Sequence, residues 1–394
     1  MNKTLVTGVG AVTPIGIEID EIWSALCELR ANFSAIDPVY PGLKPGLMAG
    51  LLTEADRKQV TESVRGAVGR DLPDSSMFAV HAALQAIADA GLEASSPQLR
   101  NALVVVGNNE AEADLVDELV EGRTDRWRDT IYSSHAVADN VASAIGSSGP
   151  AFTIHNTCAS ANVGLEFALR MIRSGAVDTA VVGGGDVFSK KVWSGFHTLN
   201  ALGPQRCRPF SASRRFITIS EGAAFLVLRA ERVAHEGRPY AELLGAASNN
   251  DAKHPTNPDA GGVGECHTRA LAAAGVRAED VDGIFAHGTG TKANDSVEGR
   301  IFSERYPNAS VSAIKGTTGH LMATAGALGG VASCLALRHQ TMPPTNIETG
   351  EFEYDFDLVT AVPGVRRELR LVQNNAFGFG GNNAITLFKA VDRK

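Results

Sequence analysis

Short apolar runs that end in glycine recur along the chain and predict buried strands. Uninterrupted hydrophobic runs of this length are typical of strands that are covered on both faces of a sheet. These runs are Leu5–Gly8, Ala102–Gly107, Thr179–Gly185, Leu243–Gly245 and Gly283–Gly288. Helical patterns such as Met77–Ala90 and His267–Ala274 lie between them, and a glycine follows each, as is common at helix ends. The alternation of strands and helices predicts a layered α/β protein.

The order of these elements indicates two halves of similar design. One half extends to about Arg229 and the other begins at about Tyr240, and no low-complexity linker divides them. Sequence identity between the halves is not evident, so the pattern alone leaves a duplication open. A charged segment, Glu110–Ser134, interrupts the first half, and we expect it to lie on the surface.

Composition narrows the class of protein. The chain has 394 residues, 44% hydrophobic and 20% charged, which is an ordinary globular composition. Its formal net charge of −8 argues against nucleic acid as the main partner. Five cysteines are scattered without a C-x-x-C pair, so neither a zinc site nor a disulfide framework is indicated. Because no signal peptide pattern and no membrane-spanning apolar run are present, we expect a soluble cytoplasmic protein.

A cysteine stands at the tip of a polar turn between an apolar run and a helical pattern. The stretch Thr153–Asn162 contains Cys158, and an alanine-rich helical pattern follows it as far as Ile172. The positive end of a helix dipole favours a thiolate, and the pKa of a free thiol is about 8.5. Small neighbours leave room for a substrate to reach the sulfur. A buried structural cysteine is the alternative, and this stretch alone leaves it open.

Three later stretches carry further polar groups that a nucleophilic cysteine would need. His287 follows a buried strand on a Gly/Thr turn, where its ring can point into a cleft. Lys315 and His320 bracket a second Gly/Thr turn after the apolar run Val311–Ile314. The loop Asn374–Asn383 alternates aromatic residues with glycine and could bring backbone N–H groups close to a ligand. Each stretch alone is equally typical of an ordinary loop, and only their order and spacing are specific.

Taken in order, these stretches resemble the motifs of the elongating β-ketoacyl-acyl-carrier-protein synthases, the condensing enzymes with a Cys-His-His site. The resemblance runs from Val6 to Asn383 and therefore covers essentially the whole chain. Its blocks are Asn156–Ser160, Cys207–Phe210, Ser220–Ala223, Ala286–Glu298, Lys315–His320 and Phe377–Asn383. The resemblance implies a thiolase fold, in which duplicated βαβαβαββ halves form a five-layer αβαβα sandwich. The halves would be residues 1–235 and 236–394, in a homodimer or a heterodimer with a related ketosynthase-like subunit.

The same resemblance implies the chemistry. Cys158 would take an acyl group from acyl carrier protein, and a malonyl group on the carrier would then lose carbon dioxide and attack it. His287 and His320 would stabilise the enolate oxygen through their Nε2–H groups. The backbone N–H groups of Cys158 and Phe379 would form an oxyanion hole, and the Phe379 ring would gate entry of the acyl chain.

Supporting residues follow from the resemblance in the same way. Lys315 would pair with Glu298 and order the loops of the site. Thr289, Thr291 and Thr256 would hydrogen-bond the pantetheine arm of the carrier. No metal and no bound organic cofactor would be needed, because the phosphopantetheine arrives on the carrier.

Two stretches depart from the family pattern. The segment Ser211–Ile217 keeps an arginine, Arg214, but lacks the acidic residues and the glycine that the family usually has there. Asn108, Asn109 and Glu110 stand where small or apolar residues usually line the acyl tunnel. If they face the tunnel, each unpaired polar group would cost about 1–3 kcal/mol, which slightly favours a specialised polyene or polyketide pathway over housekeeping fatty-acid synthesis. The alternative is that they lie at the dimer surface or bond each other.

The carrier is acidic in this family, so a net acidic enzyme needs a local basic patch to dock it. The candidates are Arg65, Arg70, Arg126, Arg128, Arg206, Lys190 and Lys191. Two rival interpretations remain, a non-catalytic chain-length-factor-like partner subunit and a thiolase or priming-type enzyme. The first usually lacks the cysteine. The second would need another catalytic cysteine near the C-terminal loop, or an Asn in place of the second His.

Overall fold

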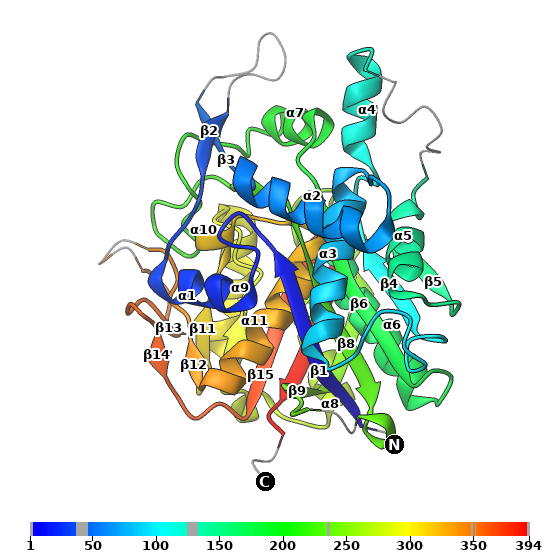
Figure 1. Cartoon of the computed structure of the whole chain (residues 1–394). Helices are drawn as coiled ribbons and strands as arrows, with labels where there is room; N and C mark the ends of the chain where they lie inside the picture. The colour runs from blue at the N-terminus through cyan, green and yellow to red at the C-terminus, as the bar shows by residue number, and fades with distance from the viewer. Residues whose placement is uncertain are drawn as a thin grey trace.

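The computed structural model describes residues 3–36, 46–123, 133–234, 237–347, 350 and 352–391. A mixed sheet of 11 strands runs through this part of the chain, in the order β13-β11-β10-β15-β16-β9-β1-β8-β6-β4-β5. Helices pack on both of its faces (Figure 1). The layered α/β arrangement predicted from the alternation of strands and helices is confirmed.

Each half of the chain contributes eight elements to this arrangement. In the first half they are β1 (Thr4–Val12), α3 (Asp74–Asp89), β4 (Leu103–Gly107), α5 (Ala136–Ile145), β5 (Ala151–Ile154), α6 (Ser160–Arg173), β6 (Thr179–Asp186) and β8 (Gly222–Ala230). In the second half they are β9 (Ala241–Asn250), α8 (Ala260–Ala274), β10 (Gly283–Phe285), α9 (Lys292–Arg305), β11 (Ser310–Ser312), α11 (Ala325–His339), β15 (Leu371–Gly378) and β16 (Asn382–Lys389).

The two halves repeat one topology. In each half the five strands lie in the spatial order third, second, fourth, fifth, first. In each half the third, second and fourth strands are parallel, and the fifth is antiparallel to both of its neighbours. The predicted βαβαβαββ duplication is therefore confirmed. The boundary predicted between residues 235 and 236 lies outside the described residues.

Three hydrophobic cores separate the layers. α6 and α11 lie between the two halves of the sheet and contact strands of both. α3 and α5 cover the outer face of the first half, whereas α8 and α9 cover the outer face of the second. This order gives the predicted five-layer sandwich (Figure 1).

The apolar strands allow close packing because their glycines admit a helix backbone. Every residue of β1 is buried. A Cβ atom on Gly8 would lie 2.1 Å from the carbonyl oxygen of Ala86 in α3, so only glycine permits this approach. The glycine within the first predicted strand thus sets the distance between two layers.

Shorter elements lie outside the repeat. The helices outside the repeat are α1 (Ile19–Glu28), α2 (Glu54–Val68), α4 (Ala113–Val120), α7 (Lys190–Thr198) and α10 (Lys315–Thr318). The short strands are β2 (Ser34–Ile36), β3 (Leu47–Gly50), β7 (Ile219–Ser220), β12 (Thr341–Met342), β13 (Asp357–Leu358) and β14 (Val365–Arg366).

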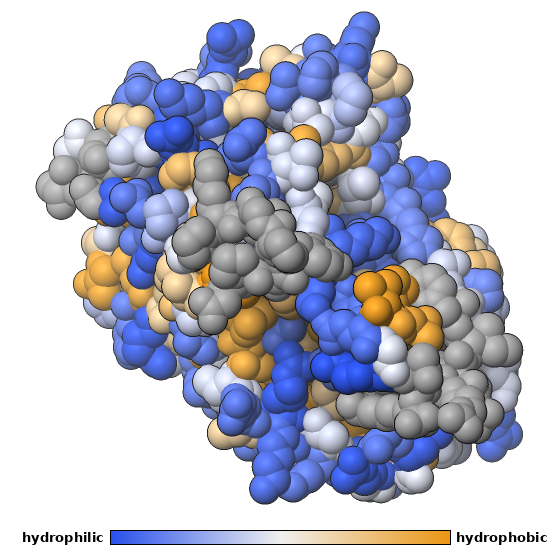
Figure 2. All heavy atoms as spheres, turned by 90° about the horizontal axis from the view of Figure 1, so that it is seen from above, coloured by the Kyte–Doolittle hydropathy of each residue, from blue (hydrophilic) through white to orange (hydrophobic). Residues whose placement is uncertain are grey.

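The segment 110–134 contains a helix and lies only partly at the surface, because Glu112, Ala113 and Leu115 are buried. Its residues 124–132, which include four charged residues, lie outside the described residues. Leu119 and Val120 of α4 are exposed to 55% and 72%. Figure 2 shows a mostly hydrophilic face here, interrupted by a compact hydrophobic patch. Among the described residues, no helix is both long and apolar enough to cross a membrane.

Candidate active site

Cys158 occupies a tight turn between the end of β5 and the start of α6. The preceding residue, Thr157, has a left-handed backbone with φ of 51°. The hydroxyl of Ser160 closes the turn, because it accepts from the Asn156 N–H at 2.8 Å and donates to the Thr157 carbonyl at 2.6 Å. A non-glycine residue in this conformation is strained, and such strain is typical of functional turns. Cys158 is buried, with 9% of its surface exposed.

The thiol of Cys158 is protonated at neutral pH, contrary to the expectation of a thiolate. Burial raises its pKa to about 12, and the nearby Asp186 raises it further, while Lys315 lowers it. The positive end of α6 acts in the same direction as Lys315, but desolvation of the charged sulfur is the larger effect. The sulfur must therefore lose this proton in the course of its attack.

His287 and His320 lie side by side as neutral imidazoles. Their ring centroids are 5.3 Å apart and their planes are inclined by 81°. Burial and the Lys315 cation hold the pKa of both rings well below the usual 6.5. Nδ1 of His320 accepts from the Met322 N–H at 3.0 Å, and Nδ1 of His287 faces the Lys315 ammonium at 3.4 Å. Both protons must therefore sit on Nε2, the tautomer that the enolate-stabilising role requires.

Lys315 and Glu298 brace the same loop without touching each other. Lys315 donates to the backbone carbonyl of His287, and Glu298 accepts the N–H groups of His287 and Gly288 at 2.9 and 2.7 Å. No direct ion pair joins the two side chains in the described part of the chain. The expected direct ion pair is therefore wrong, although the Glu298 charge still acts on Lys315 across this gap and raises its pKa against the lowering by burial.

Most of the remaining predicted residues line one cavity. Cys158, His287 and His320 meet in it, with Phe379 at its wall. The three threonines expected to contact pantetheine also line it, and they are Thr256, Thr289 and Thr291. The ring of Phe379 is 37% exposed and lies 5.8 Å from that of Phe196. Sequence reasoning missed Phe196, Ile217 and Asn257, which also line the cavity and carry no chemical motif.

The Gly/Phe loop after β15 lies directly over the cysteine turn. A Cβ atom on Gly378 would lie 1.9 Å from Oγ1 of Thr157 and 2.9 Å from the backbone nitrogen of Cys158. The Thr157 hydroxyl also donates to the carbonyl of Phe379 at 3.1 Å. Residues more than 200 positions apart in the chain thus form one wall of the cavity.

Comparison with known families agrees with this geometry. Residues 1–234 match the family described as beta-ketoacyl synthase, N-terminal domain, and residues 240–347 match beta-ketoacyl synthase, C-terminal domain. The chain belongs to the β-ketoacyl synthase family. The predicted family, the thiolase fold and the class of acyltransferase are therefore confirmed. The family also supports the expectation that no cofactor is bound, because ketosynthases take substrates on the phosphopantetheine of acyl carrier protein.

Individual relatives match along their whole length. Nodulation protein E of Rhizobium meliloti (strain 1021) is 33% identical, with 99% of both chains covered. The 3-oxoacyl-[acyl-carrier-protein] synthase 2 of Coxiella burnetii is 30% identical, again over 99% of both. The ishigamide ketosynthase/chain length factor matches in structure with a TM-score of 0.89 and 31% identity, covering 99% of this chain and 100% of the other.

In this ketosynthase, Asn108 and Asn109 are satisfied by the protein and do not line the cavity of Cys158. Asn108 is fully buried, donates to the carbonyl of Gly185 at 2.6 Å and accepts from the N–H of Ala111. Glu110 forms an ion pair with Lys191 at 2.6 Å. Both asparagines are paired with other groups of the protein and not with each other, so the cost of an unpaired polar group does not argue for a polar acyl substrate.

The unusual loop 211–217 is anchored by Arg214. Its guanidinium is buried and donates to Glu353 at 2.7 Å and to the hydroxyl of Tyr354 at 2.6 Å. Ser211 and Ser213 hydrogen-bond each other at 3.0 Å. The hydroxyls of Ser211 and Ser213 and the Arg214 guanidinium thus stabilise this turn without the acidic residues and the glycine that the family usually has there.

Most of the basic residues considered for carrier docking are already paired. Arg65 pairs with Asp71 at 2.7 Å, and Lys190 pairs with Glu121. Arg70 donates to Asn140, Lys191 pairs with Glu110 as above, and Arg126 and Arg128 lie outside the described residues. Arg206 is partly buried, and the charged neighbours that act on it are Cys207 and Arg208, not carboxylates.

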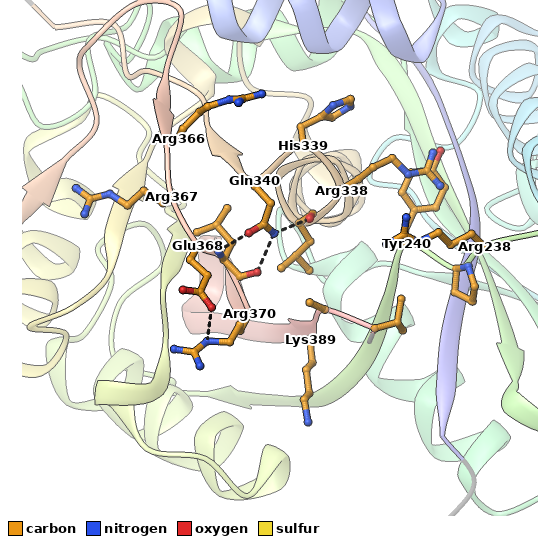
Figure 3. A pocket seen from close by; sticks show the side chains of 15 residues that line it. Arg238, Tyr240, Arg338, His339, Gln340, Arg366, Arg367, Glu368, Arg370 and Lys389 are labelled. Atoms are coloured by element: carbon orange, nitrogen blue, oxygen red, sulfur yellow. Dashed lines mark hydrogen bonds and ion pairs between the residues drawn. The ribbon is translucent and has the colours of Figure 1, made fainter. Parts of the chain in front are cut away.

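A larger hollow lies at the other ends of β15, β16 and α11, away from Cys158 (Figure 3). Its charged lining residues are Arg238, Arg338, Arg366, Arg367, Glu368, Arg370 and Lys389. Arg338 stacks over Tyr240, and Arg370 lies 3.8 Å from Glu368. None of the predicted site residues lines this hollow, so the larger of the two hollows is not the candidate active site.

No group of His, Cys, Asp and Glu among the described residues is arranged to hold a metal ion.

Proposed function

We propose that this protein condenses an acyl group carried on Cys158 with malonyl-acyl carrier protein, giving a β-ketoacyl carrier longer by two carbons. The observation that carries the proposal is the meeting of Cys158 with the two neutral imidazoles of His287 and His320 in one cavity. We place the enzyme in the cytoplasm, as a homodimer or with a related ketosynthase-like subunit, and the mass in solution measured by light scattering tests the assembly.

The first half-reaction loads the enzyme. The Cys158 sulfur attacks the thioester carbonyl as its own proton passes to the departing carrier sulfur, so the carrier leaves as a thiol and neither imidazole, whose Nε2 already carries a hydrogen, has to accept a proton. The backbone N–H groups of Cys158 and Phe379 stabilise the oxyanion, consistent with the close approach of the Gly378 backbone to the cysteine turn. Thr289 and Thr291, whose hydroxyls are 2.9 Å apart, hold the pantetheine arm together with Thr256.

The second half-reaction forms the carbon–carbon bond. The bond from the malonyl carbon to its carboxylate breaks, carbon dioxide leaves, and the electron pair forms an enolate. The Nε2–H groups of His287 and His320 donate to the enolate oxygen. The enolate carbon then attacks the acyl carbonyl, and the Cys158 sulfur leaves as a thiolate that takes up a proton from solvent.

Lys315 and Glu298 act indirectly in this scheme. Burial is the main reason that both imidazoles stay neutral, and the Lys315 ammonium adds to this effect and fixes the His287 tautomer, while Glu298 accepts the backbone N–H groups of His287 and Gly288. Because this tautomer leaves Nε2–H as the donor to the enolate oxygen, Lys315 contributes to catalysis without contacting the substrate.

We propose a specialised pathway with discrete subunits as the setting of this enzyme. The support is the similarity to the ishigamide ketosynthase/chain length factor over the whole chain. A role as a non-catalytic chain-length-factor-like subunit is the second candidate, because the same relative's name includes such a subunit.

Decarboxylation of malonyl-carrier without any acyl donor separates these candidates. We expect carbon dioxide release by the wild-type protein and a loss of about 10²–10³-fold in His287→Ala, because an oxyanion donor is removed. His339→Ala is the matched control, since His339 stacks on Trp23 at the far end of α11. No release by the wild-type protein would contradict the condensing function and favour the non-catalytic subunit.

A further inference from the structure

Asn109 and Asp186 connect the two turns that carry the reactive groups. Asp186 is the last residue of β6 and is fully buried. Its carboxylate accepts the N–H of Asn109 at 2.9 Å and the N–H of Ala323 at 2.7 Å. The Asn109 amide, oriented to satisfy its neighbours, donates to the Thr157 carbonyl at 3.2 Å and accepts from Ala323 at 3.2 Å.

Both ends of this network are strained. Thr157 has φ of 51° and directly precedes Cys158. Met322 has φ of 48°, directly precedes Ala323, and donates the hydrogen bond that fixes the tautomer of His320. Non-glycine residues in the left-handed region cost about 1–3 kcal/mol each and persist only where their surroundings hold them.

We propose that Asn109 and Asp186 are positioning residues that fix the cysteine turn and the His320 turn relative to each other. The inference rests on the proposed condensing function for its catalytic meaning, but the brace itself is a property of the fold. The Asn109 amide bonds Thr157, which precedes Cys158, and Ala323, which follows Met322. The Asp186 carboxylate accepts the backbone N–H groups of both Asn109 and Ala323. Movement of either turn would break at least one of these hydrogen bonds.

The placement also accounts for two polar residues that the acyl cavity does not use. Asn109 follows the end of β4 and Asp186 ends β6, and these two strands are parallel neighbours. The adjacent strand ends therefore deliver an amide and a carboxylate to one spot beside the cysteine turn. Burial raises the pKa of Asp186 to about 8, although backbone hydrogen bonds from Asn109, Ala323 and Glu110 favour the ionised form.

Asn109→Ala tests the brace, with Asn108→Ala as the matched control. Asn108 is the adjacent residue, is more deeply buried and bonds only backbone groups away from both turns. We expect Asn109→Ala to lower kcat for condensation about 10–100-fold while KM for the carrier stays within about twofold, because small displacements of reacting groups are costly. Asn108→Ala should lower the melting temperature yet keep kcat within about threefold.

A second readout keeps this test separate from the proposed function. The rate of alkylation of Cys158 by iodoacetamide depends on the turn and not on condensation. It should change at least about threefold in Asn109→Ala and in Asp186→Asn, but not in Asn108→Ala. Equal alkylation rates in all variants, or equal losses of kcat in Asn108→Ala and Asn109→Ala, would overturn the brace. A wild-type protein that does not condense, with altered alkylation in Asn109→Ala, would overturn only the proposed function.

Discussion

At the scale of single residues, the chemistry depends on charge states that burial sets. Cys158, His287 and His320 are all held in their neutral forms, the thiol by a raised pKa and the imidazoles by lowered pKa values. Neutral imidazoles that carry their hydrogen on Nε2 suit a site that must donate N–H groups to an enolate. The same dry environment strengthens each hydrogen bond made to the developing negative charge.

The reactivity of Cys158 should therefore rise steadily with pH. Its pKa is raised, so the thiol is neutral across the working range and the thiolate fraction grows about tenfold per pH unit as pH increases. We expect the alkylation rate by iodoacetamide to climb from pH 7 to pH 9 without a plateau. Peptide mapping by mass spectrometry should place the label on Cys158, with the buried Cys207 and Cys334 as internal controls. A plateau below pH 8 would instead indicate the thiolate that the helix dipole suggested.

At the scale of elements, the site depends on loops that approach within van der Waals distance. β5 and α6 present the cysteine, β10 leads to His287, and β15 ends in the loop that covers both. α9 contributes Glu298, which accepts the backbone N–H groups after β10. Each reactive group thus has its position fixed by an element other than its own.

Gly378→Ala should disable the site by contact alone. Gly378 has φ of −127°, which any residue can adopt, so the effect comes from the methyl group meeting Thr157 and the Cys158 backbone. We expect a loss of about 100-fold in condensation and a destabilisation of about 1–3 kcal/mol, from turnover and thermal melting. Gly66→Ala in α2 is the control, because no atom lies within 4 Å of its added Cβ. Full activity in Gly378→Ala would show that the loop moves freely.

At the scale of the whole molecule, a net acidic protein has to attract an acidic carrier. Net charge is −8, so attraction must come from a local basic surface. The charged groups that shift the pKa of Arg206 are Cys207 and Arg208, and no carboxylate is among them. The neighbouring Cys207 contacts the Lys315 carbonyl at 3.0 Å. It therefore lies on a loop continuous with the site.

Arg206→Glu should weaken the reaction with carrier substrates selectively. We expect kcat/KM for malonyl-carrier to fall about 10-fold or more, and the difference from wild type to shrink at high salt, because screening removes charge steering. Turnover of a small-molecule thioester should change little. Arg277→Glu is a suitable control, since Arg277 precedes β10 on the end of the sheet away from His287. Equal losses with both kinds of substrate would exclude Arg206 as a docking residue.

The sequence by itself determined the class of fold and the identity of the reactive groups. The apolar runs ending in glycine form β1, β4, β6, β9 and β10. These strands could be predicted because the period and the length of a hydrophobic run are local properties of the sequence. Cys158, His287, Lys315 and His320 stood out because each follows an apolar strand on a turn of small residues.

Tertiary structure alone decided how these groups are tuned and held. Burial reversed the expected charge state of Cys158, since desolvation depends on neighbours far apart in the chain. In the folded chain Lys315 and Glu298 bond the same backbone segment and not each other. Asn109 bonds the cysteine turn and does not line the acyl cavity, and Asp186 lies beside that turn. Hydrogen bonds between distant strand ends have no local pattern, so only the folded chain reveals them.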